Sequence, residues 1–181
     1  MARTAAAALG HTSYSELDLR GDYALTSPAL KLKTKIALPG DVHTALLAAG
    51  EIPDPYFGAN EQAVMWVHQT PWTMERRFTA SAADATGYLT LTLDSVDCIA
   101  TIWLNGETIA RTDNAFIRND IDVTGTVREG DNTLRIDFAV APEVAKARYD
   151  AHPRPIPCTK NYQTNGLKGI HMIFIRKTAC H

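Results

Sequence analysis

The sequence predicts an all-β sandwich, and three observations support that fold class. Tyr88–Asp94 (YLTLTLD) alternates apolar residues with threonine, which is the period of a half-buried strand. Asn105-Gly106 separates the strand-like runs Cys98–Leu104 and Glu107–Arg111, and this dipeptide favours the type I′ turn of a hairpin. Short runs of this kind recur along the chain with turn residues between them, as is typical of a sandwich.

The other expected elements follow the same reasoning in chain order. Further strands are predicted where apolar residues alternate between turn residues, at Tyr23–Thr26, Lys31–Ala37, Met74–Thr79, Thr133–Val140 and His171–Arg176. Two short helices interrupt the strands. Asp41 is placed to cap a helix over His43–Ala49 that stops at Gly50. Pro142 precedes a second helix over Glu143–Tyr149, because proline suits the first helical position.

The composition is that of an ordinary globular domain. Of 181 residues, 45% are hydrophobic and 21% are charged, and the net charge of −2 gives no electrostatic case for nucleic acid or an anionic membrane as partner. No apolar run is long enough for a membrane span, and the N-terminal alanine run lacks a signal core. Cys98, Cys158 and Cys180 lack the spacing of a disulfide framework or a zinc site. We therefore expect a cytoplasmic protein.

The segment Leu38–Phe78 is the most distinctive part of the chain. It reads LPGDVHTALLAAGEIPDPYFGANEQAVMWVHQTPWTMERRF, with a Pro-Gly, an IPDPY loop, an Asn-Glu and two tryptophans. This segment resembles the N-terminal, sugar-binding-type domain of glycoside hydrolase family 2 β-mannosidases. The resemblance continues to Arg176-Lys177 and Cys180-His181, which are similar to the segment that precedes a Gly-Trp-Asp-Trp-Gly-Pro motif in the family. Tyr23 departs from the pattern, since the family often has tryptophan there, but a ring is kept.

The resemblance implies a fold, a domain division and a parent enzyme. The fold would be a galactose-binding-domain-like jelly roll with two short helices over residues 17–181, after an N-terminal tail at 1–16 and ending before the catalytic barrel. The parent would remove terminal non-reducing β-D-mannose with retention, using two glutamates on that barrel. The chain alone is then expected to be inactive, with no catalytic residue and no cofactor. The barrel would dock on an exposed face at Pro53–Phe57 and Ile170–Ile175, which could otherwise mediate self-association.

Three residues are candidates for substrate binding: Trp66, Gln69 and Trp72. An indole presents a flat apolar face to the C–H face of a pyranose, and in the family this segment lies toward the catalytic cleft. The two tryptophans flank Pro71, and the sequence favours neither burial nor exposure of their side chains. Trp103 lies inside a strand-like run, which favours a place in the core.

Asn60-Glu61 has the order of the acid/base dipeptide of this hydrolase clan. Its expected position in a loop of the sandwich argues against catalysis, because the catalytic pair belongs to barrel strands and nothing nominates a second carboxylate. The six histidines show no metal-ligand spacing.

Two further functions remain open beside the role as a hydrolase module. One is a free-standing lectin-like module, because jelly rolls often bind glycans at loops or concave faces. The other is a purely structural domain that braces the barrel. The C-terminal FIRKTACH is unlike the finished strand and polar tail expected of a self-sufficient module.

Overall fold

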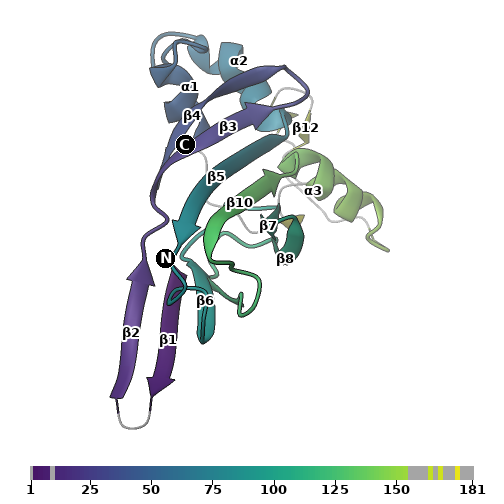
Figure 1. Cartoon of the computed structure of the whole chain (residues 1–181). Helices are drawn as coiled ribbons and strands as arrows, with labels where there is room; N and C mark the ends of the chain where they lie inside the picture. The colour runs from purple at the N-terminus through teal and green to yellow at the C-terminus, as the bar shows by residue number, and fades with distance from the viewer. Residues whose placement is uncertain (1, 9–10, 155–162, 165–166, 169–173, 176–181) are drawn as a thin grey trace.

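The computed structural model describes residues 2–8, 11–154, 163–164, 167–168 and 174–175 (Figure 1). Among these, it describes the side chains of residues 15–154 and 174–175. Antiparallel strands dominate it, so the predicted all-β sandwich with short helices is confirmed. The strands are β1 (Ala2–Ala8), β2 (His11–Leu17), β3 (Gly21–Ser27), β4 (Leu32–Leu38), β5 (Trp72–Ala80), β6 (Tyr88–Leu93), β7 (Ala100–Leu104), β8 (Glu107–Thr112), β9 (Asn119–Asp122), β10 (Gly130–Phe138), β11 (Gln163–Thr164) and β12 (Leu167–Lys168). The helices are α1 (Val42–Ala48), α2 (Asn60–Val64), the 3-10 helix η1 (Met65–Gln69) and α3 (Ala141–Asp150).

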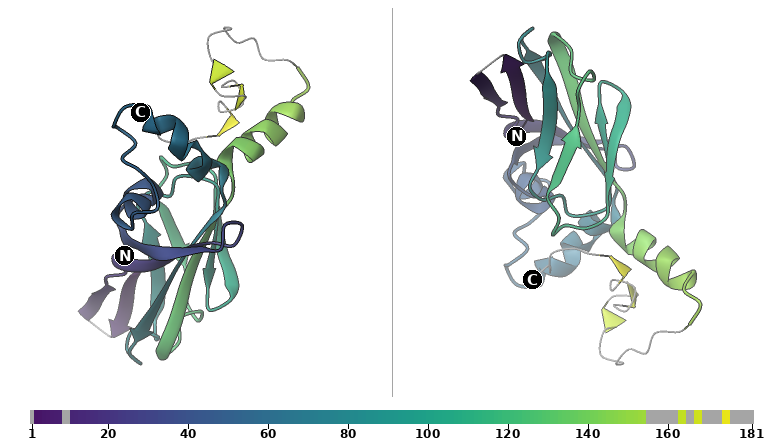
Figure 2. Two further views of the ribbon diagram at one scale, coloured as in Figure 1. Left: turned by 90° about the horizontal axis from the view of Figure 1, so that it is seen from above. Right: turned by 90° about the horizontal axis from the view of Figure 1, so that it is seen from below.

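Two sheets make up the sandwich, which Figure 2 shows from above and from below. The larger sheet has the order β4-β3-β5-β10-β7-β8, and the smaller one has the order β2-β1-β6-β9. The pairing of β5 with β10 runs without a break from Trp72 opposite Phe138 to Ala80 opposite Gly130. Helices α1, α2 and η1 fill the connection from β4 to β5, and α3 follows β10.

The core lies between the two sheets because alternate strand residues point inward. From the large sheet it receives Leu25, Ile36, Trp72, Met74, Ile102, Leu104, Leu134 and Ile136, and from the small sheet Leu89 and Leu91. A second, smaller cluster under α3 contains Cys98, Ala115, Ala145 and Ile175. These apolar side chains are largely removed from water, which is the main favourable contribution to folding.

The predicted turn and helix ends are confirmed. Asn105 and Gly106 have φ angles of 53° and 87°, the two positive values that a type I′ turn needs. The Asp41 carboxylate accepts a hydrogen bond from the Thr44 amide at 3.0 Å and so caps α1. Past the end of that helix, Gly50 has a φ of 72°.

Other expectations need correction. Asn60-Glu61 does not lie in a loop: it begins α2. The strand expected at His171–Arg176 is wrong where the chain is described, since Phe174 and Ile175 form a 3-10 turn and a bend, and its other residues lie outside the described part. Ile175 is buried under α3, so it does not belong to an exposed face. The expected tail at 1–16 contains β1 and most of β2, and the domain boundary at residue 17 stays a prediction.

Gly106→Val should lower the free energy of unfolding by at least about 1 kcal/mol, because a β-branched residue is strained at positive φ. No heavy atom lies within 4 Å of a Cβ added there, so the cost is one of backbone conformation rather than of a clash. Chemical denaturation measures it, with Glu107→Val on the adjacent exposed position as the control. Equal stability of the two variants would contradict the turn assignment.

Candidate functional site

The segment with the three predicted site residues connects α2 to β5 through η1. Trp66 lies within η1, Gln69 ends it, and Trp72 is the first residue of β5. The Thr70 hydroxyl donates to the Trp66 carbonyl at 2.8 Å and tightens the turn between the two elements. The two indole rings come within 6.3 Å of each other, centroid to centroid, at an interplanar angle of 39°. The structure therefore brings the two tryptophans together.

The three side chains differ in their access to solvent. Trp72 is buried in the core, and its indole N–H donates to the Val67 carbonyl at 2.9 Å. Trp66 is half-buried and packs against the same core, whereas Gln69 is exposed. With its face covered and its N–H engaged, Trp72 is placed to brace η1 rather than to stack on a sugar. The prediction of sugar contact therefore rests on Trp66 and Gln69.

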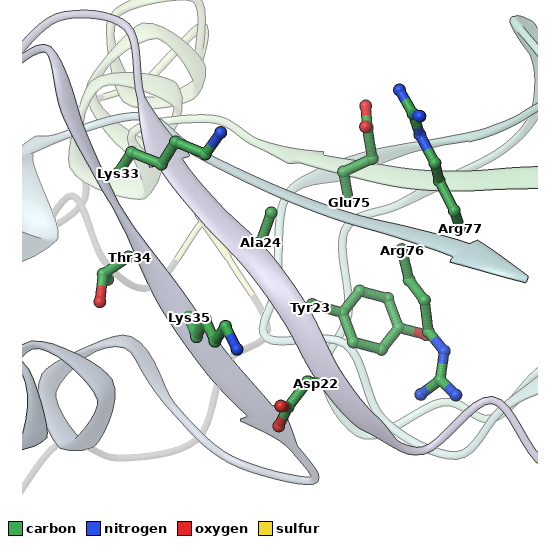
Figure 3. Close-up of a pocket in the computed structure, with 9 residues that line it drawn as sticks. All are labelled: Asp22, Tyr23, Ala24, Lys33, Thr34, Lys35, Glu75, Arg76 and Arg77. Carbon is green, nitrogen blue, oxygen red and sulfur yellow. The ribbon is translucent and has the colours of Figure 1, made fainter.

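A shallow groove of about 570 Å³ crosses the outer face of β4, β3 and β5 (Figure 3). Ala24 forms its narrow floor, and its cross-strand neighbours are Lys35 on β4 and Glu75 on β5. Figure 3 shows Glu75 and Arg77 on one side of β5 and Arg76 on the other. The groove thus has charged side chains of both signs around the methyl group of Ala24. Such a surface favours ion pairs and bound water over the binding of a neutral sugar ring. The groove contains none of the three predicted residues.

Behind that groove, Tyr23 and Arg76 hold the start of β3 in place. The Tyr23 hydroxyl donates to the Leu19 carbonyl at 2.8 Å, and the Arg76 guanidinium donates to the Leu19 and Arg20 carbonyls. Arg76 also lies 5.7 Å from the Tyr23 ring centroid. Burial raises the pKa of the Tyr23 phenol, and the charge of Arg76 offsets only part of that effect. Both side chains therefore stabilise the fold at this end of β3.

Trp103 does not lie in the core, contrary to the sequence-based expectation. Strand alternation sends its neighbours Ile102 and Leu104 inward, so Trp103 points to the outer face. There the Arg135 guanidinium lies 4.8 Å from the Trp103 ring centroid and donates to Asp137 at 2.9 Å. The strand period, which sets Trp103 on the same side as Thr101 and opposite to Ile102 and Leu104, was the sequence signal that could have placed this side chain correctly.

A second hollow of about 450 Å³ lies where β7 and β8 meet α3. Arg148 of α3 lies beside it and donates to Asp113 at 3.1 Å and to the Phe174 carbonyl at 2.9 Å. The Phe174 ring makes an edge contact with Tyr149 at 5.9 Å between centroids. These contacts hold residues 174–175 against α3, so the charged groups beside this hollow have a structural role.

The described carboxylates with known partners serve local structure rather than catalysis. Burial alone would raise the pKa of Asp41, but hydrogen bonds from the Thr44 hydroxyl and amide outweigh it and leave the pKa below its ordinary value. Asp137 accepts from Thr73 and Arg135, and Asp120 pairs with Arg118. Glu61 is exposed in the first turn of α2. Retaining hydrolysis instead needs two carboxyl groups held about 5 to 5.5 Å apart in a site.

The part of the chain that the structure describes also contains no candidate metal centre. Among those residues, no three His, Cys, Asp or Glu side chains gather closely enough to hold a metal ion.

Comparisons with known proteins agree with this geometry. Residues 23–181 match the family described as the glycosyl hydrolase 2 galactose-binding domain-like domain. Among curated proteins, the chain is 34% identical over 172 residues to the β-mannosidase of Rattus norvegicus and 29% identical over 167 residues to a probable β-mannosidase of Caenorhabditis elegans. These matches cover 93% and 89% of the chain, and they confirm the resemblance seen in the sequence.

Solved structures give the same result for the fold. A β-D-mannosidase of Dictyoglomus thermophilum matches 76% of the chain with a TM-score of 0.73 and 31% identity, over 17% of its own chain. An exo-chitosanase of Amycolatopsis orientalis matches 65% of the chain, and 16% of its own, with a TM-score of 0.58 and 23% identity, which shows the fold alone. The chain spans only 19% and 18% of the rat and C. elegans proteins.

Trp72→Phe should lower the free energy of unfolding by about 1 to 2 kcal/mol, because the Val67 carbonyl loses its donor and the smaller ring leaves a gap. Gln69→Ala, three residues earlier and exposed, is the matched control and should change stability by less than about 0.5 kcal/mol. Thermal and urea unfolding compare the two variants. If both are as stable as the parent, Trp72 is not a packing residue.

Proposed function

Because this chain belongs to the glycosyl hydrolase 2 galactose-binding domain-like family, we propose that it is the non-catalytic N-terminal module of a larger hydrolase that removes terminal β-D-mannose residues. The observation that carries the proposal is the 34% identity with the rat β-mannosidase over almost the whole chain. The D. thermophilum β-D-mannosidase, at 31% identity, adds structural support for the same substrate class. Hydrolysis would then belong to another domain of the longer protein.

The arrangement of side chains supports a module rather than an independent enzyme. Buried residues such as Trp72 and Ile102 pack the sandwich, and an arginine beside each hollow, Arg76 or Arg148, holds backbone carbonyls. A sugar site instead needs a concave pocket with converging polar groups. In the longer protein the catalytic domain would supply most of that pocket.

Trp66 and Gln69 are our candidates for a contribution of this module to the sugar site. Gln69 is exposed at the end of η1, and Trp66, three residues before it, is half-buried and packs against the core. An amide with a nearby indole can offer a sugar hydroxyl both a donor and an acceptor beside an apolar surface. Trp72, beneath them, would fix the orientation of η1.

A cytoplasmic location forms part of the same proposal, and fractionation of cells that produce the protein tests it. It rests on the sequence, in which the three cysteines lack the spacing of a disulfide framework. None of the helices that the structure describes has the length and apolar character needed to span a bilayer.

The chain by itself should release no aryl leaving group from a β-mannoside, and it should bind free mannose with a dissociation constant of about 1 mM or weaker. The reason is that described carboxylates such as Asp41, Asp120 and Asp137 are engaged in a helix cap or in ion pairs, and that the rest of a sugar pocket would belong to the catalytic domain. Chromogenic assay and isothermal titration measure the two quantities. Glu61→Gln serves as the control, since any trace of contaminating activity should be the same in that variant.

Turnover that survives purification and is lost in Glu61→Gln would overturn the non-catalytic assignment. Micromolar mannose binding without turnover would favour the lectin-like module instead.

A further inference from the structure

Two pairs of consecutive residues expose large apolar side chains to solvent. Tyr56 and Phe57 are 90% and 76% exposed, and Phe116 and Ile117 are 68% and 53% exposed. Single exposed apolar residues are normal on a protein surface, whereas contiguous exposed apolar surface marks interaction sites, and each pair contributes two neighbouring side chains to such a surface. None of these four side chains belongs to either of the core clusters described above.

The loop 54–60, which runs up to Asn60 at the start of α2, holds the first pair outward by hydrogen bonds. The Asp54 carboxylate accepts from the Tyr56 amide at 2.9 Å, and the Asp54 carbonyl accepts from the Asn60 side chain at 2.9 Å and from the Phe57 amide at 3.2 Å. The Asn60 amide in turn donates to the Phe57 carbonyl at 3.2 Å. The backbone is therefore ordered in advance, and little conformational entropy would be lost if a partner covered the two rings.

The loop 114–119 repeats this arrangement. The Asn114 side chain accepts from the Phe116 amide at 3.0 Å, just as Asp54 does two residues before Tyr56. The Asn119 side chain donates to the Ile117 carbonyl at 3.0 Å, and Ser95 donates to the Ala115 carbonyl at 2.8 Å. Each loop thus uses its polar side chains to fix the backbone while its apolar side chains stay exposed.

Both loops are tied to the same end of the large sheet. Loop 114–119 follows Thr112, which pairs with Ala100, and Ala100 pairs with Phe138. Loop 54–60 reaches that end through α2 and η1, which lead to Trp72 opposite Phe138. Helix α3 connects the two regions, since it contacts η1 and packs on Ala115. One partner could therefore cover both loops.

The partner that fits is a folded protein surface rather than a glycan. A sugar would stack on the rings, but Ile117 has no flat face, and stacking would leave it exposed. Curated relatives are roughly five times as long as this chain, because it spans 18% and 19% of them, so a large neighbouring domain is available within one polypeptide. Interfaces between domains of one chain commonly bury about 600 to 1,500 Å². The two loops would contribute part of that area.

We propose that Tyr56, Phe57, Phe116 and Ile117 form the contact that seats this domain on the remainder of its hydrolase. The proposal rests on the function proposed above, in which the chain is one module of a longer protein. It adds loop 114–119 to the docking face and removes Ile175, which is buried under α3.

Hydroxyl-radical footprinting with mass spectrometry tests this directly, because it reports the solvent access of individual side chains. The isolated chain is compared with the longer protein expressed from the complete gene. We expect oxidation of the four residues to fall severalfold in the longer protein. Tyr88, which is 76% exposed at the start of β6, is the internal control and should be oxidised equally in both.

Equal oxidation of the four residues in the two proteins would overturn the proposal. Protection in the isolated chain that rises with its concentration would assign the surface to a second copy, and protection on adding mannose would assign it to sugar. Either result would also contradict the proposed contact.

Variants separate docking from folding. Tyr56→Ser with Phe57→Ser, or Phe116→Ser with Ile117→Ser, should leave the isolated chain as stable as the parent because these side chains are exposed. In the longer protein the same changes should release this domain to an earlier, separate unfolding transition, whereas Tyr88→Ser should not. A single unchanged transition in all variants would contradict the contact.

The outcome is distinguishable from that of the proposed function. Protected residues in a longer protein without β-mannosidase activity would leave the contact standing and contradict the substrate. An active β-mannosidase with unprotected residues would contradict the contact alone.

Discussion

The pairing of β5 with β10 is the constraint on which the other features of this domain depend. Nine consecutive residue pairs fix the register, so that Trp72, Met74, Leu134 and Ile136 all point into the core. A slip of one residue would reverse every one of these side chains. Because this register sets Trp72 opposite Phe138, η1, which precedes Trp72, and α3, which follows Phe138, meet at one end of the sheet, together with the candidate residues Trp66 and Gln69.

Much of the fold could be predicted from the sequence because its signals are local. Threonine alternation marked β6, and Asn105-Gly106 marked the turn between β7 and β8, since each depends only on neighbouring residues. The outward position of Trp103 was missed, because hydrophobicity alone favours burial and the strand period had to decide. The capping role of Asp41 was correct, whereas the α2 helix was missed because five residues carry little periodicity.

The candidate site was less predictable, because its character depends on contacts between distant or unlike elements. Trp66 and Trp72 look equivalent in the sequence, yet the Val67 carbonyl binds the indole N–H of Trp72 and makes it a packing residue. The exposure of Tyr56 and Phe57 was expected from the family resemblance. That of Phe116 and Ile117 was not, because an apolar pair beside a strand-like run is more often buried.

Immunodepletion tests the central claim, that this chain is a module of a larger β-mannosidase-like hydrolase, most directly. An antibody raised against the chain is used to clear a lysate of cells that produce it, and aryl β-mannoside hydrolysis is measured in the supernatant and on the beads. Our account predicts that the activity leaves the supernatant and appears on the beads with a protein much larger than 19.8 kDa. Activity that stays in the supernatant while a 19.8 kDa protein is captured would contradict it.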